Sequence, residues 1–316
     1  MQLKESANSP RSYAHPKYWS IWCGLFLFRA LLYLPLKVQF ALGGSLGVLG
    51  YSLAKSRRAI TKTNLRIAYP EASETALRLL TKDVFRQAGI SLFETLLVWF
   101  RPHVFEGRIN YVGLEAVKDT LKQRGILLIG AHYSAIELGA ASGKLFGDAG
   151  AVYRPQNNPL FEHIIHSGRS DYMRVQIPAK SASKAATQAL RDRFLIWYTP
   201  DQDFGLKHGL MAEFFGHPAA TVSATGSLVN AGRAALLFGH ICRTKNPGWF
   251  SKPEYQLTFV APASPFPSES ISADTQLIND HMEALIRLAP TQYMWFHKRF
   301  KTQPDGINPY GGRKKR

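Results

Sequence analysis

The residues best suited to chemistry in this chain are His132 and Glu137, which close the stretch Gly125–Glu137. Imidazole takes up a proton near neutral pH, and a carboxylate within reach can fix its tautomer and stabilise the imidazolium that forms. The pair therefore predicts a general base, His132, oriented by Glu137 and acting on a substrate hydroxyl. Because this spacing also arises by chance, a purely structural histidine stays open as the alternative.

The position of His132 favours the catalytic interpretation. The apolar run Ile126–Ile129 has the length of a buried strand and is followed by small residues. His132 comes directly after it, at the carboxyl end of a strand, where α/β proteins place their ligands.

Basic and amide side chains gather around a second predicted strand end. Arg154 and Asn158 lie between a strand and the helix that follows it, and Arg169 lies one helix later. Helix N-termini and guanidinium groups both bind phosphate and developing oxyanions. We expect Arg154, Asn158 and Arg169 to bind substrate, with surface arginines paired to nearby acids as the alternative.

Asp201 and Asp203 follow the predicted strand Phe194–Thr199. We expect both to contact substrate. An Asp-x-Asp pair at a strand end also holds a divalent metal in many glycosyltransferases, or hydrogen-bonds to loop amides. The sequence has no Walker A loop, which excludes a P-loop nucleotidase.

Alternating strand and helix patterns run through the middle of the chain and position these residues. The pattern predicts a mixed, mostly parallel α/β sheet flanked by helices. The predicted strands are 108–112, 125–131, 150–153, 175–177, 194–199, 235–242 and 255–260. The predicted helices begin with 71–100 and continue with 114–122, 134–145, 159–168, 181–193 and 273–288.

The charge of the chain is strongly positive, at +17 over 316 residues. Residues 6–70 contain no Asp or Glu but nine Lys or Arg, and the chain closes with Arg313–Arg316. Such a charge favours an anionic partner, which leaves nucleic acid, acidic lipid and an acidic carrier protein as candidates. No interleaved aromatic and basic face points to nucleic acid. The two cysteines are too few for a disulfide framework and fit a reducing, cytosol-facing environment.

Two apolar segments near the start of the chain, Tyr18–Leu36 and Val38–Ala54, approach the length needed to span a bilayer. Interfacial aromatics and a basic flank around Arg57 suit a membrane anchor with a cytoplasmic face. Two buried core helices are the alternative. We therefore expect an N-terminal membrane anchor and basic flank over residues 1–70, a catalytic domain over 71–305 and a basic tail over 306–316.

The ordered motifs of the chain resemble the lipid A late acyltransferases, the lauroyl and myristoyl transferases of Gram-negative inner membranes. The resemblance runs from His15 to Thr302. Its most specific parts are His132–Glu137, Val152–Pro155 with Asn158–Leu160, Trp197–Asp203 and Ala289–Thr302.

The resemblance implies a glycerol-3-phosphate acyltransferase-like fold and a direct acyl transfer without an acyl-enzyme. His132 would be the base and Glu137 its orienting residue, while Arg154 and Arg169 would hold an acceptor phosphate or the thioester oxyanion. The donor would be acyl carrier protein and the acceptor a 3-hydroxyacyl chain on a phosphorylated glucosamine disaccharide. It implies no cofactor and no metal, and a place on the cytoplasmic face of the cell inner membrane. The alternatives are an acyltransferase for ornithine lipid or phosphoinositol mannoside, and a metal-dependent glycosyltransferase.

Overall fold

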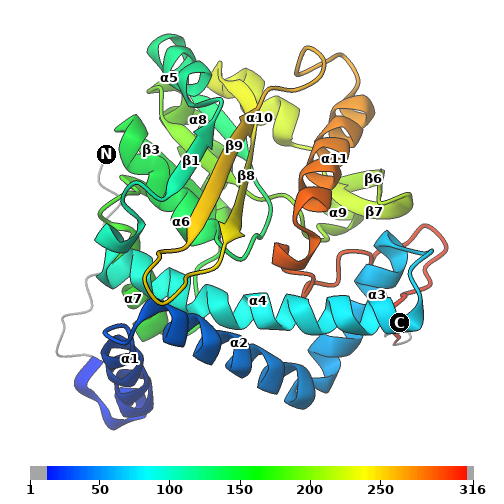
Figure 1. The fold of residues 1–316 in the computed structure, drawn as a ribbon. Helices are drawn as coiled ribbons and strands as arrows, with labels where there is room; N and C mark the ends of the chain where they lie inside the picture. The colour runs from blue at the N-terminus through cyan, green and yellow to red at the C-terminus, as the bar shows by residue number, and fades with distance from the viewer. Residues whose placement is uncertain (1–12, 312–316) are drawn as a thin grey trace.

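A seven-stranded sheet lies at the centre of the structure, a computed structural model that describes residues 13–311 (Figure 1). The strand order is β1-β9-β8-β2-β5-β3-β4, and every neighbouring pair is parallel except β8 with β9. This confirms the predicted mixed, mostly parallel α/β sheet. The strands of this sheet are β1 (Ile109–Val112), β2 (Ile126–Ile129), β3 (Ala149–Tyr153), β4 (Val175–Pro178), β5 (Leu195–Tyr198), β8 (Ala235–Lys245) and β9 (Glu254–Val260).

Helices flank the sheet, and the long α4 runs beneath it with α2 packed along α4 (Figure 1). The helices that open the chain are α1 (Trp19–Leu31), α2 (Leu36–Leu53), α3 (Lys55–Ala68) and α4 (Glu74–Phe100). Those of the central fold are α5 (Leu114–Gln123), α6 (Ile136–Ala141), α7 (Pro159–Arg169), α8 (Ala182–Arg191), α9 (Gly205–His208), α10 (Thr225–Gly232) and α11 (Ile271–Leu288). Short 3-10 turns include η2 (Pro16–Tyr18), η3 (Pro102–Phe105), η4 (Ser142–Phe146), η5 (Ala179–Ser181) and η6 (Pro290–Gln292).

The central strand β2 shows why a continuous apolar run correctly predicts a buried strand. All four of its residues are buried, because β2 lies inside a sheet whose two faces are covered by helices. A strand covered on both faces has no solvent side and needs a continuous apolar run rather than alternation. In register, Ile129 of β2 lies opposite Tyr198 of β5, so the segments that follow these two residues leave the sheet at the same edge.

One hairpin was not anticipated from the sequence. Strands β6 (Gly209–Phe214) and β7 (His217–Val222) form a separate two-stranded sheet. Their two-residue turn holds Phe215 and Gly216 at φ values of 53° and 67°. A turn of this kind usually carries Asn-Gly or Asp-Gly, so a phenylalanine in the first turn position gives little local signal.

The glycines of the second apolar segment bring α2 and α4 into close contact. A Cβ on Gly47 would lie 2.1 Å from the Phe85 carbonyl oxygen, and one on Gly89 would lie 2.0 Å from that of Gly43. Only glycine permits this approach, and Gly43, Gly44 and Gly47 are among the five buried residues of α2. Within residues 13–311, no helix combines the length and the apolar character that crossing a bilayer requires. The predicted N-terminal anchor is therefore not confirmed.

The predicted domain limits fall between elements of the structure. The limit at residue 70 lies in the turn between α3 and α4, and residues 306–311 of the predicted tail lie after the last helical turn. Residues 312–316 of the tail lie outside the described residues. The limits themselves stay predictions.

Candidate active site

Two loops from neighbouring parallel strands meet at the carboxyl edge of the sheet. His132 lies three residues beyond Ile129 of β2, and Asp201 lies three residues beyond its register partner Tyr198 of β5. His132 Nδ1 lies 2.7 Å from Asp201 Oδ1, and the His132 backbone N–H donates to Asp201 Oδ2 at 2.9 Å. Both carboxylate oxygens therefore fix the position of His132.

This pairing is electrostatically strong because Asp201 is fully buried, whereas the His132 side chain stays 27% exposed. Burial raises the pKa of the Asp201 carboxyl, but the charge of His132 and its hydrogen bonds outweigh burial and hold that pKa at about 2. Burial lowers the pKa of His132, but the charge and hydrogen bond of Asp201 raise it above its ordinary value. With Asp201 ionised, Nδ1 carries the proton and Nε2 of the neutral ring is an acceptor.

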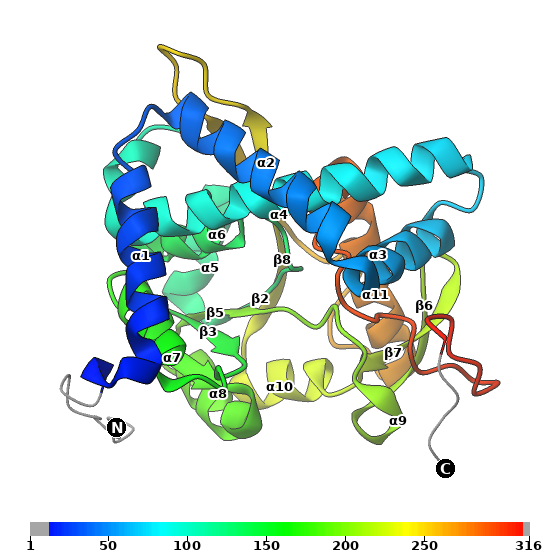
Figure 2. The ribbon, with the colours of Figure 1, turned by 90° about the horizontal axis from the view of Figure 1, so that it is seen from below.

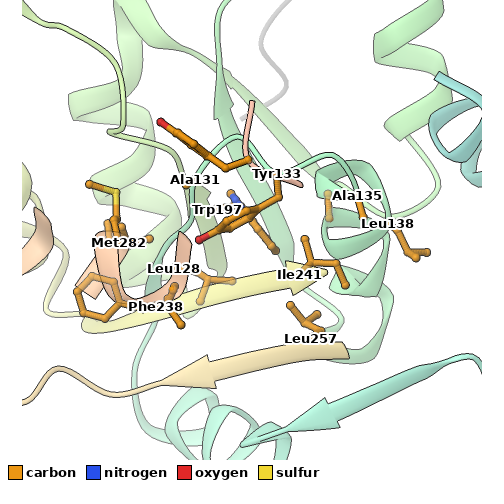
Figure 3. Close-up of a cluster of buried hydrophobic side chains, with 14 of the residues drawn as sticks. Leu128, Ala131, Tyr133, Ala135, Leu138, Trp197, Phe238, Ile241, Leu257 and Met282 are labelled. Atoms are coloured by element: carbon orange, nitrogen blue, oxygen red, sulfur yellow. The ribbon is translucent and has the colours of Figure 1, made fainter. Parts of the chain in front are cut away.

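The neighbours of His132 anchor its loop in the core. Ala131 and Tyr133 are buried, and both belong to a cluster of apolar side chains with Leu128, Trp197 and Phe238 (Figure 3). A loop held on both sides of a reactive residue keeps that residue in one geometry.

The segment after η6 forms a further wall of the site. Met294 donates its backbone N–H to the His132 carbonyl at 2.8 Å, and Tyr133 and Tyr293 form an isolated antiparallel bridge. The same segment carries His297, whose ring centroid lies 5.1 Å from that of His132. The sequence motif Ala289–Thr302 therefore reaches the His132 loop.

Gln202 lies between the two imidazole rings. Its Nε2 is 3.3 Å from His132 Nε2 and 3.3 Å from His297 Nε2. Gln202 and His297 were not predicted from the sequence as functional residues. Their location within the motifs Trp197–Asp203 and Ala289–Thr302 is the available signal. It becomes meaningful only when the loop after β5 and the segment after η6 are known to meet.

Asp203 has a structural role in the same loop. It accepts hydrogen bonds from the Thr302 backbone N–H at 2.7 Å, from Thr302 Oγ1 at 3.0 Å and from the Gly205 N–H at 3.0 Å. These contacts match the loop-capping alternative for this residue. Among residues 13–311, no cluster of three or more His, Cys, Asp or Glu side chains is arranged to hold a metal ion.

The structure corrects the predicted pairing of His132 with Glu137. Arg169 binds the Glu137 carboxylate through two nitrogens, Nε at 2.8 Å and Nη2 at 2.7 Å. Trp99 Nε1 donates at 3.0 Å, and the Tyr172 hydroxyl also donates to the same carboxylate. In the part of the chain that the structure describes, no hydrogen bond joins Glu137 to His132.

The physical reason for this correction is the geometry of α6. Glu137 lies in the first turn of α6, which packs against α4, and the side chain meets donors from α4, from α7 and from Tyr172 just beyond α7. Burial raises the pKa of Glu137, but the hydrogen bonds and charge of Arg169 outweigh burial and lower it. Glu137 is thus an ionised anchor for Arg169, and Asp201 takes the place predicted for it beside His132.

The other predicted substrate-binding residues lie near the start and end of α7. Asn158 is the N-cap of that helix, and its Oδ1 accepts from the Leu160 and Phe161 N–H groups. The side chain of Arg154 is exposed and makes no hydrogen bond within residues 13–311. Arg169 ends α7, where its pairing with Glu137 leaves Nη1 without a protein hydrogen bond in that range. No side-chain hydrogen bond or salt bridge within residues 13–311 joins any of the three to His132.

Replacing Glu137 by leucine is expected to lower the free energy of unfolding by about 3–5 kcal/mol, because it leaves the buried Arg169 charge without a partner. Urea unfolding measures this loss, and the double variant Glu137→Leu with Arg169→Met should recover part of it. The pH at which His132 is protonated should not move, because the carboxylate does not contact the ring. A shift of that pH would instead support the pairing of Glu137 with His132.

The chemistry that this arrangement can perform is general base catalysis. Asp201 orients His132 and stabilises the imidazolium, while Nε2 accepts a proton from a bound hydroxyl. The loop after β5 supplies Asp201 and the loop after β2 supplies His132. The segment after η6 forms a polar wall beside them.

Comparison with known proteins places the chain in a family. Residues 7–302 match the family described as bacterial lipid A biosynthesis acyltransferase. The chain is 33% identical over 296 residues to the lipid A biosynthesis lauroyltransferase of Escherichia coli (strain K12), covering 93% of this chain and 95% of the relative. It is 30% identical over 302 residues to the palmitoleoyltransferase of the same organism, covering 94% and 95%. The myristoyltransferase of that organism is 26% identical over 310 residues, covering 95% and 93%.

Proposed function

The chain belongs to the bacterial lipid A biosynthesis acyltransferase family and is an acyltransferase, and we propose that it acts on a lipid A precursor with acyl carrier protein as donor. It would move a secondary fatty acyl chain to the hydroxyl of a 3-hydroxyacyl chain on a phosphorylated glucosamine disaccharide. The observation that carries this proposal is the His132–Asp201 hydrogen bond of 2.7 Å. It leaves Nε2 of the partly exposed His132 ring free to accept a proton.

The proposed reaction is a direct transfer. His132 Nε2 takes the proton of the acceptor hydroxyl as its oxygen bonds to the thioester carbonyl carbon, and the carbonyl electron pair moves to oxygen. Collapse of this tetrahedral intermediate re-forms the carbonyl and breaks the C–S bond. The thiolate that leaves takes the proton back from His132, so the base is regenerated without a covalent enzyme intermediate or a cofactor.

The charge of the protein suits this pair of substrates. Acyl carrier protein is acidic and the acceptor is phosphorylated, and a net charge of +17 attracts both. We propose that Arg154 and Arg169 Nη1 provide donors for anionic groups near α7. Asn158 and Asp203 would contribute through the loops that they fix rather than through the substrate itself.

We propose that the enzyme docks on the cytoplasmic face of the inner membrane through α1, α2 and the β8–β9 loop. None of the 13 residues of α1 is buried, and the loop projects beside the N-terminal end of α2 (Figure 2). Lys37 Nζ lies 4.6 Å from the centroid of the Trp249 ring, which joins the loop to α2. The exposed apolar side chains of this surface include Trp19, Phe26, Leu27, Leu46, Leu49, Leu53, Trp249 and Phe250. With basic residues and no acidic ones over 6–70, the surface suits an anionic bilayer.

Serine in place of both Phe26 and Phe250 is expected to weaken binding to anionic phospholipid vesicles by roughly 10-fold or more, because each exposed ring would otherwise leave water. Vesicle co-sedimentation measures this change. The control Ile271→Ser removes an exposed apolar side chain from the start of α11, on a different part of the molecule, and should bind as the wild type does. Equal binding by the double variant would contradict the docking surface.

The experiment that tests the function is a transfer assay with purified enzyme. Acyl carrier protein with a labelled acyl chain is mixed with the phosphorylated disaccharide, and mass spectrometry locates the added chain. Ornithine lipid and phosphoinositol mannoside compete as acceptors in parallel reactions. Preferential acylation of either would overturn the proposed acceptor, and absence of transfer from acyl carrier protein would overturn the proposed donor.

A further inference from the structure

We propose that Gln202 stabilises the tetrahedral oxyanion of acyl transfer and that His297 is the residue that positions the Gln202 amide. This inference rests on the proposed acyltransferase function and deepens it. It starts from the location of the Gln202 amide nitrogen, 3.3 Å from the base nitrogen of His132.

The backbone around Gln202 is fixed on both sides. Asp201 is tied to His132, and Asp203 is tied to Thr302. The Gln202 carbonyl itself accepts from Arg299 Nη1 at 3.3 Å, and the Arg299 side chain is buried against Ala220 and Thr221. A donor whose main chain cannot move is preorganised, and preorganised donors stabilise developing charge most effectively.

The amide of Gln202 has two N–H groups and faces two acceptors. Because Asp201 holds the proton of His132 on Nδ1, His132 Nε2 offers a lone pair to one N–H. The other N–H faces His297 Nε2 at 3.3 Å. The opposite amide orientation would place the carbonyl oxygen against the lone pair of His132, so this geometry assigns the nitrogen to the site.

Substrate binding then releases one donor at the place where charge develops. The acceptor hydroxyl must approach His132 Nε2 to about 2.6–3.2 Å, and it thereby replaces the Gln202 N–H at that nitrogen. The attacking oxygen and the oxyanion share one tetrahedral carbon and lie next to each other. The released N–H of Gln202 is thus directed at the oxyanion while the second N–H stays on His297.

His297 is suited to hold the amide because it is a neutral acceptor. Burial lowers the pKa of His297, and the charges of His132 and Arg57 lower it further, against the opposing charge of Asp201. Its backbone carbonyl accepts from Asn64 Nδ2 at 2.7 Å, which fixes the residue against α3. His297 does not meet the reacting atoms in this scheme and acts through Gln202.

The test compares Gln202→Leu with wild type on acyl carrier protein thioesters, at a pH where His132 is fully neutral. Loss of an oxyanion donor is expected to lower kcat by about 10²–10³-fold with little change in KM. Gln202→Glu keeps the shape, loses the donor and adds a negative charge, so it should lose at least as much. The control Gln188→Leu removes an exposed amide of α8 that donates to Asp192, and this variant should keep wild-type kcat.

A double-mutant cycle tests the positioning role of His297. His297→Ala alone should lower kcat, but it should add little to the loss in the Gln202→Leu background, because it acts through the same amide. Multiplicative losses in the cycle would contradict that role. Circular dichroism and thermal unfolding of each variant separate loss of the site from loss of the fold.

Three results would overturn the assignment of Gln202. These are a wild-type kcat in Gln202→Leu, a rise in KM alone, or a loss at low pH that disappears when His132 is neutral. The last result would mean that Gln202 only sets the protonation of His132. A wild-type enzyme that consumes no acyl thioester would contradict the proposed function as well, whereas an active wild type with an equally active Gln202→Leu would contradict this inference alone.

Discussion

Asparagine in place of Asp201 is expected to lower kcat on the order of 10³–10⁴-fold, because the amide neither holds the proton of His132 on Nδ1 nor stabilises the imidazolium. The acid limb of the pH–rate profile should also move to lower pH. In the wild type, the Asp201 charge raises the pKa of His132 above its ordinary value, so the base loses activity as the pH falls through that raised pKa. Without the charge, burial alone acts on the ring and lowers its pKa.

The measurement is kcat/KM as a function of pH for the wild type and Asp201→Asn. The matched control is Asp203→Asn, which changes the neighbouring carboxylate of the same loop but does not face the His132 ring. The control should leave the acid limb at the wild-type pH, even where it weakens the loop. An acid limb that does not move in Asp201→Asn would show that another group orients the base.

Loss of the imidazole in His132→Ala is expected to lower kcat by roughly 10²–10⁴-fold or more, because the variant lacks the base that Asp201 orients. The substitution also leaves the fully buried Asp201 without its main partner. The pKa of the Asp201 carboxyl should therefore rise from its wild-type value of about 2. His132→Gln keeps an amide donor near the carboxylate and still lacks the base. It should therefore fold more stably than His132→Ala and be equally inactive.

Single-turnover transfer from labelled acyl carrier protein measures the chemical step in these variants. His103→Ala serves as the control, because His103 is exposed in η3. Its rate should equal that of the wild type. Full activity in His132→Ala, with an intact fold by circular dichroism, would remove His132 from the proposed mechanism.

The elements around the site could be predicted from the sequence where local pattern decides the structure. The apolar run of β2 and the start of α7 at Pro159 each depend on residues only a few positions apart. The β6–β7 hairpin was missed because its turn at Phe215 adopts left-handed backbone angles without the usual residue types. The burial of α2 against α4 corresponds to the alternative expectation of two buried core helices, because glycines in an apolar segment suit a helix contact as well as a bilayer.

The partner of His132 could not be predicted because it depends on strand order. Glu137 is near in sequence, but the start of α6 directs it to Arg169. Asp201 is 69 residues from His132 in sequence and becomes its neighbour only because β5 lies next to β2. Once β2 and β5 are known to be neighbours, His132 and Asp201 can be recognised as a pair. Each lies three residues beyond one of the register partners Ile129 and Tyr198.

The wall formed by the segment after η6 has a consequence for the synthesis of this enzyme. The loops of His132 and Asp201 leave the ribosome long before Met294, His297 and Thr302, which hold the His132 carbonyl, the Gln202 amide and Asp203. Since chains emerge at about 5–20 residues per second and fold as they emerge, a nascent chain has the acid and the base but not the wall. The site is thus completed only after residues 294–302 have left the ribosome and packed against the two loops, so the acid–base pair precedes the wall that completes its site.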